Sequence, residues 1–420
     1  MKKIQIDRQF IEKEMKYWKI PGMAVVLMQD GAPDQIECFG YRNAQTKEPV
    51  TAETLFCIAS CSKSMNAALM ARLCDEGTLD LDVPAVEYVP FLKWYDEETS
   101  KSITLRDMLC HRSGLPPHDE LWPGNETREN LAHSMKYLEP VAKLGEKALY
   151  NNTVYALSSF VPEYVTGKTW HELMKQYIFE PLGMSDTRTL GDEVVNDANL
   201  ASPHRNINGK SVPVPYWNMD LSAGAAAVNS TPSDMAKWLH MHIDGGMAKG
   251  SRFLSEKMFV QLHKPHMDFG EEAEQMRDVS SLRDYCLGWV KGAYRGHVIQ
   301  KHSGKIEGYS TLQLYLPEEK IGIIILINLH EPSLPITYTI VNTMLDQILG
   351  FSDIDWVERF HCGEPEPDDR LFHECELDWT GRLDSGLRGA DAICSPKELV
   401  GVYEHPGYGK IEITFEGDRD

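Results

Sequence analysis

Strand patterns lie near both ends of this 420-residue chain, and helical patterns fill the stretch between them. Residues 22–31 and 36–43 read as two strands, and residues 310–328 form a hairpin pattern with its turn at 317–319. Residues 80–245 carry helical patterns separated by loops rich in proline and glycine. We therefore expect an α+β fold, in which one antiparallel sheet is built from both ends, is flanked by helices and contains a helical region inserted at about 80–245.

The sequence divides into one large domain and a short C-terminal part. Helical patterns at 7–18 and 336–349 complete the large domain, which we expect to span residues 1–350. Residues 351–395 are polar with little periodicity, which indicates a linker or a segment that wraps the domain. Residues 396–420 predict two strands around a Pro-Gly turn, and two strands alone are marginally stable. These strands either join the main sheet or are the start of a small, truncated β domain.

Charge and cysteine content exclude several classes of protein. The net charge of −21 at pH 7 repels phosphate backbones, so we expect no nucleic-acid partner. The nine cysteines are odd in number and include no CxxC pair, which argues against a disulfide framework or a zinc ribbon and favours a reducing compartment. No apolar run reaches the length of a membrane span, so no membrane partner is expected.

The N-terminal stretch MKKIQIDRQFIEKEMKYWKIPG carries a charge every few residues and lacks the apolar run of a signal peptide. This pattern predicts a cytoplasmic protein. A secreted protein whose signal peptide had been removed would show the same pattern.

Ser60 and Lys63 lie three residues apart, between the apolar residues 56–59 and a helical run. Residues at this spacing share one face of a helix, so Lys63 can reach the hydroxyl of Ser60. A serine nucleophile needs a base, and a lysine can be that base when burial lowers its pKa. Serine is also a preferred helix N-cap, beside which Lys63 would be an ordinary solvated side chain. The pattern alone leaves both interpretations open.

Two further short patterns could belong to the same site. Tyr-x-Asn occurs at Tyr41, Tyr150 and Tyr216, and only Tyr150 stands in a turn directly before an apolar helical pattern. A basic residue followed by Ser-Gly occurs at Arg112, in a loop, and at His302, a few residues before the predicted hairpin. Taken singly, Tyr150 is explained by ring packing and His302 by a structural histidine.

Three motifs together resemble, in order and in placement, those of the serine β-lactamase and penicillin-binding-protein superfamily: Ser60-x-x-Lys63, Tyr150-Asn151-Asn152 and His302-Ser303-Gly304. Similar stretches such as IPGMAVVLMQDG, LSAGAAAVNSTPSDMAKWL and YCLGW extend the likeness over roughly residues 7–350. The chain looks most like the class C β-lactamase branch, which also holds esterases and D-aminopeptidases. The resemblance implies a β-lactamase/transpeptidase-like fold. The last strands resemble the start of a small lipocalin-like β domain.

The resemblance also implies a role for each motif. Ser60 would attack a carbonyl carbon and form an acyl-enzyme, while Lys63 and Tyr150 share the proton, and the formal base stays open between them. The backbone N–H groups of Ser60 and Lys305 would form the oxyanion hole. The expected catalytic residues are Ser60, Lys63 and Tyr150, and the expected substrate-binding residues are Asn152, His302, Ser303, Gly304 and Lys305.

His302 departs from the pattern of β-lactamases, which usually have a lysine there to help hold the carboxylate of the drug. A histidine is largely neutral at pH 7. The resemblance therefore implies a hydrolase of small esters, amides or peptides, such as an esterase or a D-amino-acid peptidase, more than a dedicated β-lactamase, although Lys305 could supply the missing charge. The alternative is a penicillin-binding protein or sensor that β-lactams acylate with little turnover. We expect no cofactor and no metal, and the sequence leaves the oligomeric state open.

Overall fold

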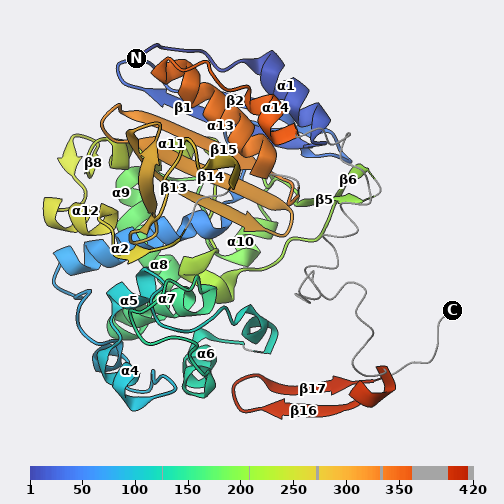
Figure 1. Ribbon diagram of the computed structural model, residues 1–420. Helices are drawn as coiled ribbons and strands as arrows, with labels where there is room; N and C mark the ends of the chain where they lie inside the picture. The colour runs from blue at the N-terminus through green and yellow to red at the C-terminus, as the bar shows by residue number, and fades with distance from the viewer. Residues whose placement is uncertain (125, 208, 271–273, 332–333, 362–395, 415–420) are drawn as a thin grey trace.

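The computed structural model describes residues 1–420 apart from 125, 208, 271–273, 332–333, 362–395 and 415–420. Within the described residues, nine strands form one antiparallel sheet in the order β10-β11-β12-β13-β14-β15-β1-β2-β3 (Figure 1). Strands β1 to β3, from the start of the chain, thus lie next to β15 and continue the sheet that strands β10 to β15 form. The strand bounds are β1 Gly22–Gln29, β2 Gln35–Asn43, β3 Glu48–Pro49, β10 Met267–Asp268, β11 Asp284–Tyr285, β12 Val290–Tyr294, β13 His297–Ile306, β14 Tyr309–Leu316 and β15 Ile321–Ile327.

The central strands β1, β14 and β15 are buried along their whole length because their residues are mostly apolar. Their register sets Ile325 between Val25 and Leu312. Successive side chains of a strand point to opposite faces, so Ile325 belongs to the core on one face and Ile324 to the core on the other. The strands predicted at 22–31 and 36–43 and the predicted hairpin at 310–328 are confirmed.

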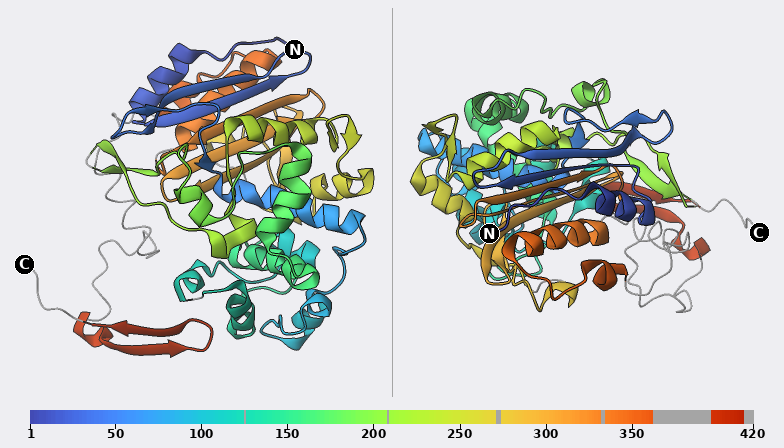
Figure 2. Two further views of the ribbon diagram at one scale, coloured as in Figure 1. Left: turned by 180° about the vertical axis from the view of Figure 1, so that it is seen from behind. Right: turned by 90° about the horizontal axis from the view of Figure 1, so that it is seen from above.

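One face of the sheet is covered by helices from the two ends of the large domain, as the view from above shows (Figure 2). These helices are α1 Arg8–Tyr17, α13 Leu334–Leu349 and α14 Trp356–His361. Helix α14 lies within the segment that the sequence predicts to be a linker. Its Trp356 is buried and donates an indole N–H to Asp346 over 2.8 Å, so this helix packs on the domain. The rest of that segment, 362–395, lies outside the described residues.

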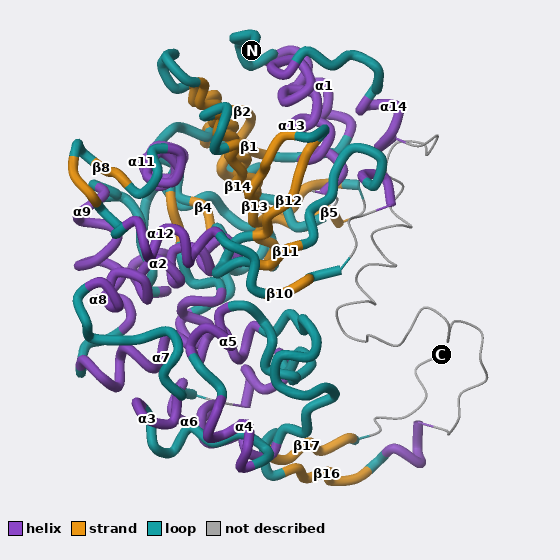
Figure 3. The backbone as a smooth tube through the Cα atoms, turned by 60° about the vertical axis from the view of Figure 1, so that its left-hand side comes forward, coloured by secondary structure: helices purple, strands orange, loops and turns teal. Residues whose placement is uncertain are grey.

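The opposite face carries α2 Ser62–Asp75 and α11 Pro232–Ile243, and most of the inserted helical region lies beyond them (Figure 3). Helix α2 is buried without a break from Ser62 to Ala71, so it runs through the centre of the molecule. The other helices on this side are α3 Ala85–Tyr88, α4 Glu97–Ser102, α5 Leu105–Leu109, α6 Arg128–Ser134, α7 Asn152–Thr166, α8 Trp170–Met174, α9 Glu180–Leu182, α10 Gly191–Val195 and α12 Glu256–His263. The prediction of an α+β fold with a helical insertion is confirmed.

Short strands form four separate pairs in the described residues: β4 Phe56–Cys57 with β7 Asn229–Ser230, β5 His204–Ile207 with β6 Lys210–Pro213, β8 Met247–Ala248 with β9 Ser251–Arg252, and β16 Gly401–His405 with β17 Gly409–Ile413. The C-terminal pair β16–β17 is therefore a hairpin of its own and does not join the main sheet. It lies beside the helical region, where Tyr408 Oη is 2.5 Å from His118 Nδ1 (Figure 1). A boundary at residue 350 stays a prediction. No helix in the described part of the chain is long and apolar enough to cross a bilayer.

Candidate active site

Ser60 lies in a tight turn between strand β4 and helix α2. A 3-10 turn, η1, spans Ala59–Cys61, and α2 begins at the next residue. Ala59 has a φ of 45°, in the left-handed region that strains any residue with a Cβ. Cys61 occupies the N-cap of α2, and no side chain caps the helix. The interpretation of Ser60 as a helix cap is therefore wrong.

Lys63 is fully buried as the second residue of α2, and its amine faces Ser60. Lys63 Nζ lies 3.1 Å from Ser60 Oγ, 2.7 Å from Asn152 Oδ1 and 3.0 Å from the carbonyl oxygen of Ala225. Burial lowers the pKa of Lys63 to about 7, an effect that the charge of Asp119 partly opposes. The interpretation of Lys63 as a solvated side chain is therefore wrong.

The partners of Lys63 also fix the direction of its lone pair. The oxygens of Asn152 and Ala225 can only accept hydrogen bonds, so they take the two N–H groups of a neutral amine. The lone pair is then left for the Ser60 hydroxyl, which can donate its proton to Nζ. This arrangement is that of a base placed next to a nucleophile.

Asn152 is the first residue of α7, and its side chain joins Lys63 to Asp119. Its Nδ2 lies 3.4 and 3.3 Å from the two carboxylate oxygens of Asp119, while its Oδ1 accepts from Lys63. The carboxylate therefore sets which amide atom faces the lysine. Sequence reasoning missed Asp119, which is 33 residues before Asn152 and begins the 3-10 turn η2, Asp119–Gly124, in a stretch whose only signal is its density of histidine and acidic residues.

Tyr150 stands two residues before α7, as predicted, and the amine of Lys63 lies over the face of its ring. Lys63 Nζ is 4.7 Å from the centroid of that ring. Burial raises the pKa of Tyr150, and a hydrogen bond with Ser60 partly offsets that rise. The other two Tyr-x-Asn motifs lie elsewhere: Tyr41 is on β2 and 41% exposed, and the hydroxyl of Tyr216 contacts Asn229.

The third motif lies on β13, directly beside the nucleophile turn. A Cβ at Gly304 would lie 2.1 Å from the carbonyl oxygen of Ile58 and 3.0 Å from the backbone nitrogen of Ser60. Only a glycine lets the strand come this close, so Gly304 is required by packing. Arg112-Ser113-Gly114 lies in the loop after α5, so its exclusion from the sheet is confirmed.

His302 points to the buried side of β13. Its Nε2 lies 3.1 Å from the hydroxyl of Tyr285, and its Nδ1 lies 2.6 Å from the carbonyl oxygen of Ser303. Burial, together with the charge of Lys63, lowers the pKa of His302 to about 3. The ring is therefore neutral at pH 7.

Ser303 and Lys305 alternate with His302 and Gly304 and are exposed on the other side of β13. The ammonium of Lys305 forms an ion pair with Glu331. The positive charge of Lys305, which could have replaced that of the usual lysine in the third motif, is therefore neutralised by Glu331.

The two cysteines beside the nucleophile, Cys57 and Cys61, are 1% and 0% exposed. Burial raises the pKa of the Cys57 thiol to about 12 and that of the Cys61 thiol further. They are packing residues. Among the residues that the structure describes, no group of three or more His, Cys, Asp or Glu side chains could hold a metal ion.

The predicted residues thus fall into three sets, one of which is Ser303 and Lys305, exposed on the other side of β13. Ser60, Lys63, Tyr150 and Asn152 meet around one amine, and Gly304 brings β13 against their turn. His302 lies on the same side of β13 as Gly304, in a buried polar cluster with Tyr285 and His111, two residues that sequence reasoning did not select. Each is more than fifteen residues from His302 in the sequence, and no local motif marks them.

The chain is similar to several known proteins. The chain is 26% identical to Unguisins hydrolase ungD of Aspergillus violaceofuscus (strain CBS 115571), over 97% of this chain and 76% of that protein. Its fold is similar to the octameric penicillin-binding protein homologue from Pyrococcus abyssi, with a TM-score of 0.69 and 25% identity over 98% of this chain and 85% of that one.

A class C beta lactamase from Rhodobacter sphaeroides shares the fold, with a TM-score of 0.65 and 20% identity over 80% of this chain and 98% of that one. The expected β-lactamase/transpeptidase-like fold is confirmed. The family described as Beta-lactamase matches residues 8–339, which is most of the sequence and includes all three motifs. The chain belongs to the Beta-lactamase family.

Proposed function

We propose that this protein is a serine hydrolase that forms an acyl-enzyme on Ser60 and hydrolyses small esters or amides, as an esterase or a D-amino-acid peptidase does. The 3.1 Å contact between Lys63 Nζ and Ser60 Oγ carries the proposal. A lysine whose pKa falls to about 7 is neutral in a large fraction of molecules at neutral pH and can accept the serine proton.

In the proposed acylation, Ser60 Oγ bonds to the carbonyl carbon of the substrate while its proton passes to Lys63 Nζ. The backbone N–H groups of Ser60 and Lys305 hold the oxyanion. When the intermediate collapses, the bond to the alcohol or amine breaks. Tyr150 protonates this leaving group and regains a proton from Lys63.

In the proposed deacylation, one water molecule attacks the acyl carbon. One proton of that water returns to Ser60 Oγ through the pair formed by Lys63 and Tyr150, and the carboxylic acid leaves. The two side chains exchange a single proton in both half-reactions, so their titration belongs to the pair.

Charge around the third motif supports substrates without a carboxylate anchor. His302 is neutral and buried, and the ammonium of Lys305 is paired with Glu331. Neither group therefore presents an uncompensated positive charge to an anionic substrate. The name of the Aspergillus relative, a hydrolase, agrees with turnover.

The test mixes the protein with a short-chain p-nitrophenyl ester and, separately, with a penicillin, and follows product release and intact mass. We expect steady release of p-nitrophenol, slower reaction with the penicillin, and loss of both in Ser60→Ala. Equal rates in the wild type and in Ser60→Ala would overturn the proposal.

A second candidate is a penicillin-binding sensor, favoured by the likeness to a penicillin-binding protein homologue. In that case the penicillin gives a lasting mass adduct on Ser60, and the ester gives one burst without turnover. Steady turnover of the ester excludes this candidate.

We also propose that residues 1–350 form the hydrolase domain and that 396–420 belong to a separate small β unit. The separate pairing of β16 with β17 supports this division.

All six described cysteines are free, which supports a reducing compartment such as the cytoplasm.

A further inference from the structure

Four hydrogen bonds in series, three of them buried and the last partly buried, run from the second motif to the third. The backbone N–H of Asn151 lies 3.2 Å from His111 Nδ1, and His111 Nε2 lies 3.1 Å from the hydroxyl of Tyr285. The same hydroxyl lies 3.1 Å from His302 Nε2, and His302 Nδ1 lies 2.6 Å from the carbonyl oxygen of Ser303. His111, Asn151 and Tyr285 are 0% exposed and His302 is 5% exposed.

Only one arrangement of protons satisfies all four contacts when both rings are neutral. The carbonyl of Ser303 can only accept, so His302 carries its proton on Nδ1 and accepts on Nε2. The Tyr285 hydroxyl therefore donates to His302 and accepts from His111 Nε2–H. His111 Nδ1 is then free to accept from the backbone of Asn151, which can only donate. Burial lowers the pKa of both histidines, so the neutral forms persist at pH 7.

This series of hydrogen bonds joins the two parts of the fold that form the site, the helical region and the sheet. His111 follows α5 and Asn151 caps α7, so both belong to the helical region. Tyr285 is on β11 and His302 on β13, so both belong to the sheet. Each end of the hydrogen-bond series lies next to residues of the proposed active site. Asn151 stands between Tyr150 and Asn152, and Ser303 precedes Gly304.

We propose that His111 and Tyr285 are positioning residues for the hydrolysis, and that His302 acts with them as a hydrogen-bond acceptor and not as a contact for the substrate. Together they set the distance between Tyr150 and strand β13. The Tyr150 ring lies against this series of hydrogen bonds, with its centroid 4.3 Å from that of His111 and 6.5 Å from that of His302. A shift of about 1 Å at such a site is large enough to impair catalysis.

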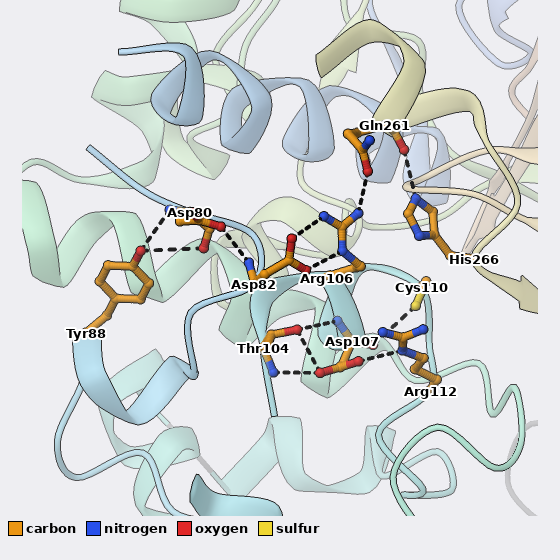
Figure 4. Close-up of polar contacts among 10 residues, drawn as sticks. All are labelled: Asp80, Asp82, Tyr88, Thr104, Arg106, Asp107, Cys110, Arg112, Gln261 and His266. Carbon is orange, nitrogen blue, oxygen red and sulfur yellow. Dashed lines mark hydrogen bonds and ion pairs between the residues drawn. The ribbon is translucent and has the colours of Figure 1, made fainter. Parts of the chain in front are cut away.

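The backbone around His111 indicates that its placement is enforced. His111 has a φ of 59°, a strained conformation that persists only where the surroundings hold it. Figure 4 shows contacts of the residues on either side of it: Asp107 closes a capping box with Thr104 at the start of α5 and accepts from Arg112 Nε over 2.5 Å. Arg112, the residue after His111, is thereby bonded to helix α5, which precedes His111.

The test compares Tyr285→Phe with a matched control, Tyr294→Phe. Tyr294 is also buried in the sheet, and its hydroxyl donates to Asp346 over 2.7 Å on the opposite face. Each variant loses one buried hydroxyl, with the bonds to His111 and His302 in Tyr285→Phe and the bond to Asp346 in Tyr294→Phe, so both should melt at a lower temperature. At a temperature where both are folded, we expect kcat for the ester to fall at least about tenfold in Tyr285→Phe, with KM little changed, and to stay at the wild-type value in Tyr294→Phe.

A second pair of variants decides the matter if Tyr285→Phe does not fold. His111→Gln keeps a donor that can reach Tyr285, and His111→Leu does not. We expect kcat to be at least about tenfold higher in His111→Gln than in His111→Leu.

This inference depends on the proposed function, and the two can fail separately. A wild-type protein without Ser60-dependent turnover contradicts the proposed function. An active wild type whose kcat is unchanged in Tyr285→Phe, or whose two His111 variants are equally active, contradicts only the positioning role.

Discussion

The two faces of the nine-stranded sheet bury very different side chains. Between the sheet and helices α1 and α13 the core is mostly apolar, and its buried carboxylates are paired, Asp346 with Arg295 and Glu14 with His361. On the other face, around α2, the interior holds Lys63, His111 and His302. Burial of apolar surface stabilises a fold, whereas burial of ionisable groups costs free energy unless they become neutral. The first face therefore supplies stability, and the second uses that stability to hold a base in a reactive form.

The largest expected effect is on the second face. Ser60→Ala removes only one oxygen, and Ser60 neither caps α2 nor fills the core, so the melting temperature should change little. Activity on the ester should fall by about 10³-fold or more. Steady-state rates and thermal denaturation of the same preparations measure both quantities. A large fall in melting temperature would contradict this separation of chemistry from stability.

Lys63→Met should lower activity by about 10²–10⁴-fold and raise the melting temperature by several degrees. The gain in stability follows because the folded protein lowers the pKa of Lys63 from 10.5 to about 7. The unfolded chain therefore binds more protons than the folded one between these values, and the stability of the wild type rises with pH across this window.

The advantage of Lys63→Met over the wild type should accordingly shrink as the pH rises from 7 to 10. Thermal denaturation of the two proteins at several pH values checks this. An advantage that is constant with pH would show that Lys63 is not held neutral by burial.

Ile325→Ala tests the first face. Ile325 is fully buried between β1 and β14, and its truncation should lower the free energy of unfolding by about 2–5 kcal/mol. The kcat of the folded variant should stay at the wild-type value. Val260→Ala, at a position 57% exposed, is the control and should change neither quantity. A loss of kcat in Ile325→Ala would mean that the two faces are coupled.

The smallest effect is the pH dependence of kcat/KM. Neutral Lys63 is the active form, so kcat/KM should rise about tenfold per pH unit below pH 7 and level off above it. His302 should not contribute to the profile between pH 5 and 9, because its pKa is about 3. Initial rates across this range test both statements, and a profile that falls as the pH rises through 7 would contradict the role of Lys63 as base.

Much of the fold follows from local patterns. The apolar runs of β1, β14 and β15 and the position of Ser60 between apolar residues and a helix are readable because period and spacing are local properties. The contacts of Asp119, His111 and Tyr285 were not predictable, because each joins residues that only the tertiary fold brings together. The direction of His302 depends on the pleat of β13, which a three-residue motif does not specify. Helix α14 is short, and contacts distant in sequence hold it in place: Trp356 is buried, Arg359 pairs with Asp278, and His361 contacts Glu14.

The burial of Cys57 and Cys61 has a practical consequence for chemical labelling. Thiol reagents react with thiolates, and a thiol with a pKa of about 12, such as Cys57, has almost none at neutral pH. In the sequence, Ser60 therefore stands between two cysteines whose thiols alkylating agents should not modify. An organophosphorus or fluorophosphonate probe could count competent molecules in a crude extract that had first been treated with iodoacetamide, with no interference from the thiols nearest to its target.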